Sequence, residues 1–304
     1  MTDKLSATLQ LAKRVYSLAQ ELNHPVLMIG GCRAFTFTLT FLGDFEMARQ
    51  YAMRGVQIWR SGVVESPIEE VNAPALSCLV FQAFCGWHIG EIDSCHATIA
   101  EAISIARERN DMHGLAVALL FAAILAQLER NPAKTERFAA EVIEVSTHQN
   151  FEAWVVSGAI LRGWARTASS KKAEGISWIE DGIRDYRTTG SILAVPYWLA
   201  IEAEALHLVG RTSEALEAIG KAEALIEMNE ERWCSAELHR LRGVFLAAMG
   251  AAESEIEASF CAAIKTAMEQ KSVSLEKRAE ATYAEYRRQK ASWSGGRGFR
   301  LPLW

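Results

Sequence analysis

The sequence predicts an all-α fold: a right-handed superhelical solenoid of about six helix–turn–helix repeats with a period near 40 residues. Three observations support this prediction. Alanine supplies 47 of the 304 residues and proline only 6, which favours helices because Ala has the highest helix propensity and Pro disrupts helix interiors. Apolar residues recur with helical spacing. Similar turn-like segments also recur at a fixed distance, which is typical of repeat arrays.

The repeats are defined by six similar segments: LGDFEMA, IGEIDSC, ERNPAKT, SSKKAEG, VGRTSEA and MGAAESE. Their reference points are Gly43, Gly90, Arg130, Ser170, Gly210 and Gly250. Successive reference points are 47, 40, 40, 40 and 40 residues apart. Glycine at such a point lets one helix end and the chain reverse. We therefore expect a tight turn inside each repeat.

Small or compact residues occur at three offsets from each turn. Seven residues before it are Thr36, Ala83, Ala123, Gly163, Ala203 and Gly243. Five residues after it are Ala48, Cys95, Thr135, Gly175, Ala215 and Glu255, although a register slip of one would make Ile256 the equivalent in the last repeat. Twelve residues after it are Gly55, Ala102, Val142, Gly182, Ala222 and Ala262. Small side chains let helices approach more closely than the usual ~8–10 Å.

Each repeat is thus predicted to be a pair of helices. The expected pairs are 27–42 with 45–60, 74–89 with 92–109, 113–129 with 133–147, 152–168 with 172–188, 193–209 with 212–228, and 232–249 with 254–269. A helix over 4–22 precedes them and another over 273–290 follows. Four prolines, Pro25, Pro74, Pro132 and Pro196, fall at or near expected helix starts, where a missing N–H costs little.

The domain organisation follows from this register. Residues 1–290 are expected to form a single repeat array, and residues 291–304 a flexible tail rich in Gly, Arg and aromatic residues. The only substantial internal loop is expected at 61–74, where the first spacing is longer. The terminal LPLW is a candidate to dock on the last helix pair and cover the end of the array.

Bulk composition excludes several classes of protein. Hydrophobic residues are 50% and charged residues 23%, which excludes collagen and a mostly disordered chain. The net charge of -5 gives no overall attraction to nucleic acid or an anionic membrane. The six cysteines include no CxxC pair and are interpreted as free, reduced thiols.

Targeting signals are also missing from the sequence. The N-terminal stretch MTDKLSATLQ lacks the apolar segment of a signal peptide. The longest apolar run, from Leu115 to Leu125, is shorter than the ~20 residues that span a membrane, so we expect a buried helix there. We therefore predict a cytoplasmic protein with no membrane partner.

The phrase VGRTSEALEAIGKAEAL (209–225) resembles the tetratricopeptide repeat, although the period of 40 exceeds the usual 34. The stretches ILRGWA (160–165), AEGISWIEDGIRDYRTTG (173–190) and AELHRLRG (236–243) are similar to the tetratricopeptide tail of bacterial multidomain signalling proteins. Those proteins carry an adenylate/guanylate cyclase or DNA-binding head and an ATPase middle. The resemblance covers roughly residues 4–290 and implies a regulatory function.

The sequence departs from that family in two ways. It contains neither the head nor the ATPase, and it ends in ASWSGGRGFRLPLW where the family's tail usually continues into further helices. The catalytic activities of the family are therefore not carried over to any residue of this chain.

Motifs that would indicate catalysis are missing. The sequence contains no GxxxxGK[ST] phosphate loop and no GxSxG nucleophile elbow. Asp181 and Asp185 lie one helical turn apart and are interpreted as a solvated face rather than a metal site. A zinc site is considered at Cys85, His88, Cys95 and His96. Because Cys95 occupies a small packing position of the repeat, packing is the favoured interpretation, and we expect no catalysis, no cofactor and no metal.

Binding is expected on the first helix of each pair, because these helices line the inner groove of such a superhelix. The candidate residues on the exposed face of these helices are Arg33, Phe37, Phe84, His88, Gln127, Trp164, Glu204, His207, Glu237 and Arg240, with Arg162 beside them. Aromatic side chains would anchor an apolar ligand or a partner helix, and charged ones would orient it. The alternatives are a core position for Phe84 and Trp164, and a surface ion pair for Glu237 with Arg240.

Three functions are considered. The leading hypothesis is a non-catalytic protein–protein interaction and regulatory module of a bacterial signalling system, whose partner would be a signalling ATPase or cyclase. The alternative is a small-molecule-sensing regulatory domain of an adenylate cyclase/ATPase-type signalling protein. An adenylate cyclase or ATPase enzyme is the third and is opposed by the missing motifs. Nucleic acid would be contacted only weakly, through the five basic residues of the stretch 287–300.

Overall fold

The structure is a computed structural model that describes residues 4–62, 69–169, 172–291, 299 and 301. The described residues form fourteen helices and no strand. The first seven are α1 (Leu5–Glu21), α2 (Pro25–Leu42), α3 (Phe45–Arg60), α4 (Glu69–His88), α5 (Ile92–Glu108), α6 (Met112–Leu128) and α7 (Pro132–His148). The others are α8 (Glu152–Ser169), α9 (Lys172–Thr188), α10 (Val195–Leu208), α11 (Thr212–Asn229), α12 (Ser235–Met249), α13 (Glu253–Glu269) and α14 (Val273–Ala291).

The six expected helix pairs are present, from α2 with α3 to α12 with α13, and they confirm the all-α solenoid. One expectation was wrong: the first helix of the second pair begins at Glu69, so Pro74 lies inside α4 rather than at its start. Proline is tolerated there because it removes only one backbone hydrogen bond near the beginning of the helix. The expected loop at 61–74 is correspondingly shorter.

The chain reverses in a left-handed conformation at the reference points. The φ angles of Gly43, Gly90, Arg130, Gly210 and Gly250 are 86°, 90°, 59°, 85° and 69°, and Ser170 lies outside the described residues. A second set of left-handed residues ends the second helix of the pairs: Asn110, Asn150, Gly190, Glu230 and Lys271. Such residues satisfy the last carbonyl groups of a helix while turning the chain, so the turns named here, within pairs and between them, share one left-handed conformation.

The small residues at fixed offsets let paired helices touch. A Cβ atom on Gly175 would lie 2.5 Å from the carbonyl oxygen of Gly163, and the Thr36 hydroxyl donates to the Ala48 carbonyl at 3.3 Å. Positions seven before and five after a turn therefore face each other across the pair. In the last repeat Glu255 is exposed and Ile256 is buried, which confirms the register slip.

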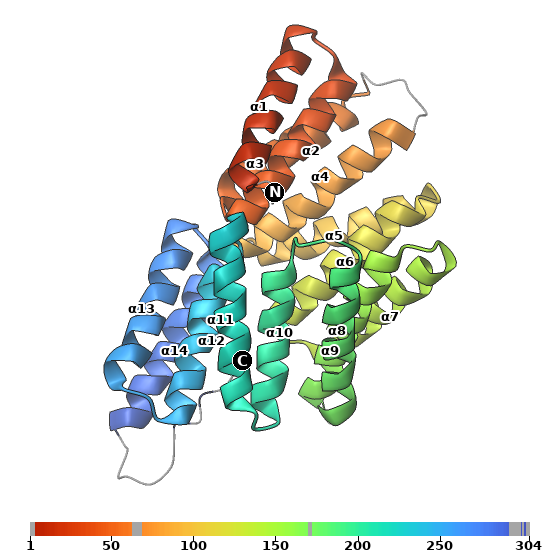
Figure 1. Cartoon of the computed structure of the whole chain (residues 1–304). Coiled ribbons are helices and arrows are strands. Elements are labelled where there is room, and N and C mark those ends of the chain that lie inside the picture. The colour runs from red at the N-terminus through yellow and green to blue at the C-terminus, as the bar shows by residue number, and fades with distance from the viewer. Residues whose placement is uncertain (1–3, 63–68, 170–171, 292–298, 300, 302–304) are drawn as a thin grey trace.

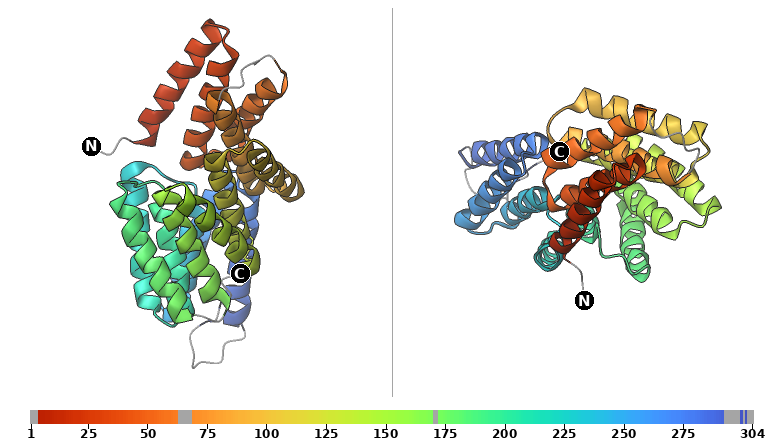
Figure 2. Two further views of the ribbon diagram at one scale, coloured as in Figure 1. Left: turned by 90° about the vertical axis from the view of Figure 1, so that its right-hand side faces the viewer. Right: turned by 90° about the horizontal axis from the view of Figure 1, so that it is seen from above.

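The first helices of the second to sixth pairs, together with α14, form an inner layer that closes into a ring. Each of α4, α6, α8, α10, α12 and α14 contacts the next, and α14 contacts α4 again. Seen from above, the helices fan around a common centre, and the C-terminal helices return to the N-terminal ones (Figures 1 and 2). The groove expected along the inside of the superhelix is therefore enclosed at its centre.

Contacts between residues distant in sequence hold the ring closed. Ser272 Oγ lies 2.9 Å from His88 Nδ1, and the Arg232 N–H donates to the Phe41 carbonyl at 2.7 Å. Lys271 also forms an ion pair with Glu46 of α3. These contacts join the α11–α12 and α13–α14 turns to the ends of α2 and α4 and to the beginning of α3.

Two helices are strongly apolar. By length and composition alone α2 resembles a membrane-spanning helix, but 44% of its residues are buried and it packs against α1, α3 and α4. In α6 every residue from Leu115 to Leu125 except Val117 is buried, which confirms the expected buried helix.

Part of the predicted C-terminal tail 291–304 is described. Ala291 ends α14, Phe299 packs against Tyr286 with ring centroids 4.9 Å apart, and Leu301 is buried. Leu301 and Phe299 thus join the hydrophobic core of the array. Most of the Gly- and Arg-rich stretch, residues 292–298, lies outside the described residues.

Two glycine substitutions test the close packing of the helix pairs. Gly175→Ala should lower the free energy of unfolding by about 1–3 kcal/mol, because the added methyl would collide with the Gly163 carbonyl and the Thr167 hydroxyl. Gly220→Ala is the control: nothing lies within 4 Å of its Cβ position in α11, so it should stabilise by about 0.5–1 kcal/mol. Urea unfolding measures both, and equal effects would contradict the assigned packing.

Candidate functional site

A buried ionic network occupies the centre of the ring. Arg130, the turn residue between α6 and α7, donates through Nη1 to both carboxylate oxygens of Glu204 at 2.6 Å and through Nη2 to Glu237. Arg240 makes a bidentate pair with Glu237 at 2.7 and 3.0 Å. Arg278 of α14 lies 3.5 Å from the same carboxylate and donates to the Leu128 carbonyl. The network therefore joins the end of α6 to α10, α12 and α14.

Neutral side chains complete the network. Trp164 of α8 donates its ring N–H to Glu204 at 2.7 Å, and the Tyr197 hydroxyl donates to Gln127 at 2.8 Å. His88 of α4 stacks on Phe45 with ring centroids 3.7 Å apart. All six helices of the inner ring thus place a side chain at or beside its centre.

The charges in this network set each other's ionisation. Burial alone would raise the pKa of Glu237, but the charges of Arg240, Arg278 and Arg130 hold it well below its usual range. Burial lowers the pKa of Arg278 to about 10, which leaves it charged at neutral pH. Burial and the charge of Arg278 lower the pKa of His88, so its imidazole is neutral. Three guanidinium groups therefore face two carboxylates.

The structure places six of the predicted groove residues at the buried centre of the ring instead of on an open groove face: His88, Gln127, Trp164, Glu204, Glu237 and Arg240. They do lie on the inner face of the first helices. Because the inner layer closes into a ring, however, they meet one another and not solvent. Glu237 and Arg240 form the ion pair weighed as an alternative, but this pair is buried and not at the surface.

Two other candidates lie apart from the centre. Arg162 pairs with Glu136 at 2.7 Å and stacks over the Trp178 ring, so it joins neighbouring helix pairs. The half-buried His207 places Nδ1 3.0 Å from the Thr212 hydroxyl across a turn. The remaining three, Arg33, Phe37 and Phe84, line a cavity at one end of the ring. Phe84 is itself buried in the hydrophobic core, the alternative considered for it.

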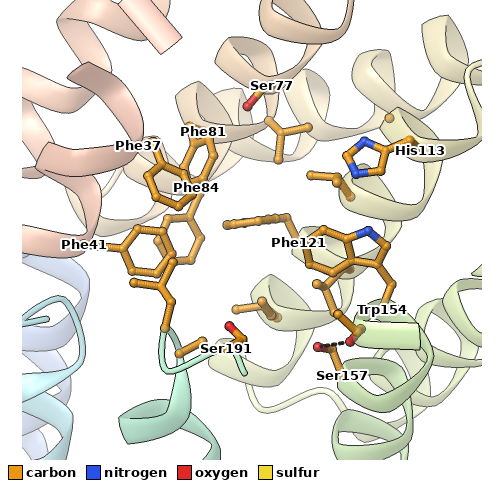
Figure 3. A pocket seen from close by; sticks show the side chains of 18 of the residues that line it. Phe37, Phe41, Ser77, Phe81, Phe84, His113, Phe121, Trp154, Ser157 and Ser191 are labelled. Atoms are coloured by element: carbon orange, nitrogen blue, oxygen red, sulfur yellow. Dashed lines mark hydrogen bonds between the residues drawn. The ribbon is translucent and has the colours of Figure 1, made fainter. Parts of the chain in front are cut away.

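This cavity has a volume of about 570 Å³. Its wall is built mainly from aromatic side chains of α2, α4, α6, α8, α9 and α10 and of the α11–α12 turn: Phe37, Phe41, Phe81, Phe84, Phe121, Trp154, Tyr186, Tyr197, Trp198 and Trp233. Figure 3 shows Phe37, Phe41, Phe81 and Phe84 on one side, Trp154 with His113 on the other, and Phe121 between them. The rings contact each other, as in the Phe81–Phe121 pair with centroids 4.9 Å apart.

Few polar groups reach the cavity. Among the described residues, Arg33 and His113 are its only basic lining residues, no acidic side chain lines it, and both basic residues are exposed at the surface. Ser77, Ser157 and Ser191 also line it, and the Ser157 hydroxyl donates to the Ala153 carbonyl at 2.8 Å (Figure 3). An apolar interior with a few polar groups at its edge suits an apolar ligand or side chain that enters from outside.

Glu231 holds two segments of the cavity wall in place. Its buried carboxylate accepts hydrogen bonds from the Ala194 N–H at 2.9 Å and from the Trp233 ring N–H at 2.9 Å. Ala194 and Trp233 both line the cavity. Burial raises the pKa of Glu231 to about 7, although these two hydrogen bonds oppose the shift.

The residues weighed for zinc do not converge. Cys85 and Cys95 are buried, and burial raises the pKa of each thiol to about 12. His88 bonds to Ser272, whereas His96 pairs with Glu129 at 2.8 Å. Within the described ranges, no group of three or more His, Cys, Asp or Glu side chains is arranged to hold a metal ion.

Several residues of the site were missed by the sequence interpretation. Arg130 stands where four of the six repeats have glycine. A long charged side chain at a position that favours glycine was the signal that could have identified it. Trp233 lies in the expected first turn of the helix 232–249, which begins only at Ser235 in the structure, and Glu231 directly precedes that expected helix. Arg278 lies on a helix outside the six repeats, and its proximity depends on ring closure, for which the repeat pattern has no signal.

Removal of Arg130 tests the central network. Arg130→Gly should lower the free energy of unfolding by about 3–5 kcal/mol, because two buried carboxylates lose their shared partner, even though glycine relieves the left-handed backbone. The control is Arg107→Ala, which removes an exposed pair with Glu141 and should cost less than about 1 kcal/mol. Similar costs for the two variants would contradict a structural function for the network.

The raised pKa of Glu231 predicts how the stability of the protein depends on pH. Its folded pKa of about 7 exceeds the unfolded value, so the folded state binds the proton more tightly and stability falls as pH rises from about 4.5 to 7. In Glu231→Gln, which keeps an acceptor oxygen, this part of the pH dependence should disappear. Urea unfolding of both proteins at several pH values measures it, and parallel curves would show that Glu231 is not responsible.

Known proteins resemble this chain more in fold than in sequence. No family model matches the chain. An uncharacterized protein of Rhizobium meliloti (strain 1021) is 22% identical over 199 residues, which cover 66% of this chain and 19% of that protein. This chain thus spans about a fifth of the length of the curated relative it matches.

Three solved structures have a similar fold. BtubC (BKLC) from P. vanneervenii has a TM-score of 0.52 at 14% identity over 74% of this chain and 92% of that one. The apo form of RapI has a TM-score of 0.54 at 13% identity, over 85% and 99%. Aspartyl phosphate phosphatase F from Bacillus subtilis has a TM-score of 0.54 at 11% identity, over 94% and 77%. The likeness establishes a fold shared with tetratricopeptide-like helical-repeat proteins.

Proposed function

We propose that this chain is a non-catalytic regulatory module that binds a partner protein by receiving bulky apolar side chains of the partner in the aromatic cavity. The cavity of about 570 Å³, lined largely by aromatic rings, is the observation on which the proposal rests. Buried aromatic pockets contribute most of the affinity in many protein–protein contacts. The fold shared with other helical-repeat proteins supports the same class of function.

The geometry limits how a partner binds. The central network fills the inside of the ring, so a segment has no continuous groove to follow. The cavity opens where Arg33, Ala73 and His113 are exposed. A short segment that inserts one or two apolar anchors and places an acidic residue near Arg33 fits this opening best.

The proposal also names the class of partner and the cellular location of the module. The resemblance of the three sequence stretches to signalling tails supports a bacterial signalling ATPase or cyclase as the partner. Free cysteines, five of them buried, suit a cytoplasmic location.

A display library of short peptides tests the proposal. We expect enriched peptides to share bulky apolar residues, and their affinity to fall roughly ten-fold or more in Ser77→Phe, which places a ring in the cavity. The matched control is Ser177→Phe on the exposed outer face of α9, which should leave the affinity unchanged. Failure to enrich any peptide, or equal binding by the two variants, would contradict the proposal.

A small-molecule sensor is the second candidate function, favoured by one specific observation. The cavity volume lies within the range of about 300–1,000 Å³ typical of small-molecule sites. For this candidate, small apolar molecules and not peptides would raise the melting temperature of the protein, and Ser77→Phe would abolish that increase.

A further inference from the structure

The first helix has two apolar faces. One face is buried against the array through Leu5, Ala12 and Ala19. A neighbouring face, about a quarter of a turn away, carries Leu11, Val15 and Leu18 and continues into Leu22 at the C-cap; their exposed fractions are 60%, 41%, 54% and 58%. α1 stands at the top of the molecule in Figure 1 and at its upper left edge in the left view of Figure 2, and no element among the described residues covers this second face.

The spacing on the exposed face is that of a coiled coil. Leu11, Val15, Leu18 and Leu22 follow each other at intervals of 4, 3 and 4 residues, which places Leu11 and Leu18 at d positions and Val15 and Leu22 at a positions of a heptad. A narrow stripe of a and d positions is the seam through which two helices pair. We refer to these four residues as the α1 seam.

We propose that a second copy of this chain docks on the α1 seam through its own α1, in antiparallel orientation. The charges beside the seam select this occupant. Arg14 and Glu21 are exposed and occupy successive g positions. In an antiparallel pair, Leu11 meets Leu22 and Val15 meets Leu18 of the second copy, and Arg14 then lies against the second copy's Glu21. The two-fold symmetry forms this ion pair twice.

The parallel arrangement lacks this complementarity. In a parallel coiled coil a g residue faces an e residue of the other helix, and the e positions of α1 are Ala12 and Ala19, which are buried against the array. Arg14 and Glu21 form no ion pair within the described chain, so both are available to the second copy. The self-complementary pattern therefore specifies orientation as well as partner.

The expected association is weak and reversible. One pair of helices buries less than the ~1,600 Å² of a standard stable interface, so we expect a dissociation constant of micromolar order. Contacts of Ser6 and Lys4 with Glu230 fix the beginning of α1 on the array, which keeps the seam in place before binding. This association is independent of the cavity and of any ligand in it.

Sedimentation equilibrium of the full chain over a range of concentrations tests the proposal by charge reversal. Arg14→Glu and Glu21→Arg should each weaken dimerisation by roughly ten-fold, because two attractive contacts become repulsive. The double variant Arg14→Glu/Glu21→Arg should recover an affinity close to that of the original protein. An equimolar mixture of the two single variants should also form a heterodimer, since every contact across that interface is again complementary.

A seam substitution gives a second readout. Leu18→Gln should abolish dimerisation while the melting temperature stays unchanged, because Leu18 is already exposed. Met268→Gln, on a side chain of similar exposure in α13, is the matched control and should leave dimerisation intact. A chain that stays monomeric well above micromolar concentration, or a dimer indifferent to Leu18→Gln and to the charge reversals, would overturn the proposal.

Discussion

The rest of the structure depends on the ion pairs that the Arg130 side chain forms with Glu204 and Glu237. Closing the inner helices into a ring brings Glu204 and Glu237 together in the interior, where two carboxylates without a cation would repel each other and lose their hydration. Arg130 bridges both. A non-glycine residue at a left-handed turn costs about 1–2 kcal/mol, and the third repeat accepts this cost because the turn is the position from which one guanidinium reaches two helices.

The position of the binding site follows from the same interaction. Because the network and its neighbours fill the middle of the ring, the concave side of this solenoid is mostly interior. What stays open is the aromatic cavity at one end, where α2, α4, α6 and α8 diverge from the α9–α10 and α11–α12 turns. Glu231 joins these two turns through Ala194 and Trp233. The closure of the ring and the shape of the cavity are thus coupled through the backbone of the last repeats.

Much of the fold could be predicted from the sequence, because a repeat encodes its local geometry many times over. The 40-residue register located both helices of each pair. It also predicted the close packing at Gly175 and the slip that buries Ile256, and the structure has both. Pro74 was misplaced because a single proline is compatible both with the start of a helix and with its first turns. Ring closure could not be predicted, since it depends on the small rotation between successive repeats.

The candidate site could be predicted only in part, because it also depends on ring closure. Residues such as Glu204 and Trp164 were expected on the inner face and lie there, but whether an inner face is open or closed is a property of the whole superhelix. Arg33, Phe37 and Phe84 lie at the cavity because the ring is open at that end. The apolar face of α1 was not predicted because α1 precedes the repeats, so their register carries no signal for it.

Zero-length cross-linking of carboxylates to amines tests the closed ring most directly. Glu46 and Lys271 form an ion pair across the closure although 225 residues separate them in sequence, so a closed ring predicts a cross-linked peptide that joins these two residues. The pair of Lys290 with Glu253, 37 residues apart within the last helices, provides an internal control. Recovery of the Lys290–Glu253 cross-link without the Glu46–Lys271 cross-link would show that the superhelix is open and would contradict ring closure.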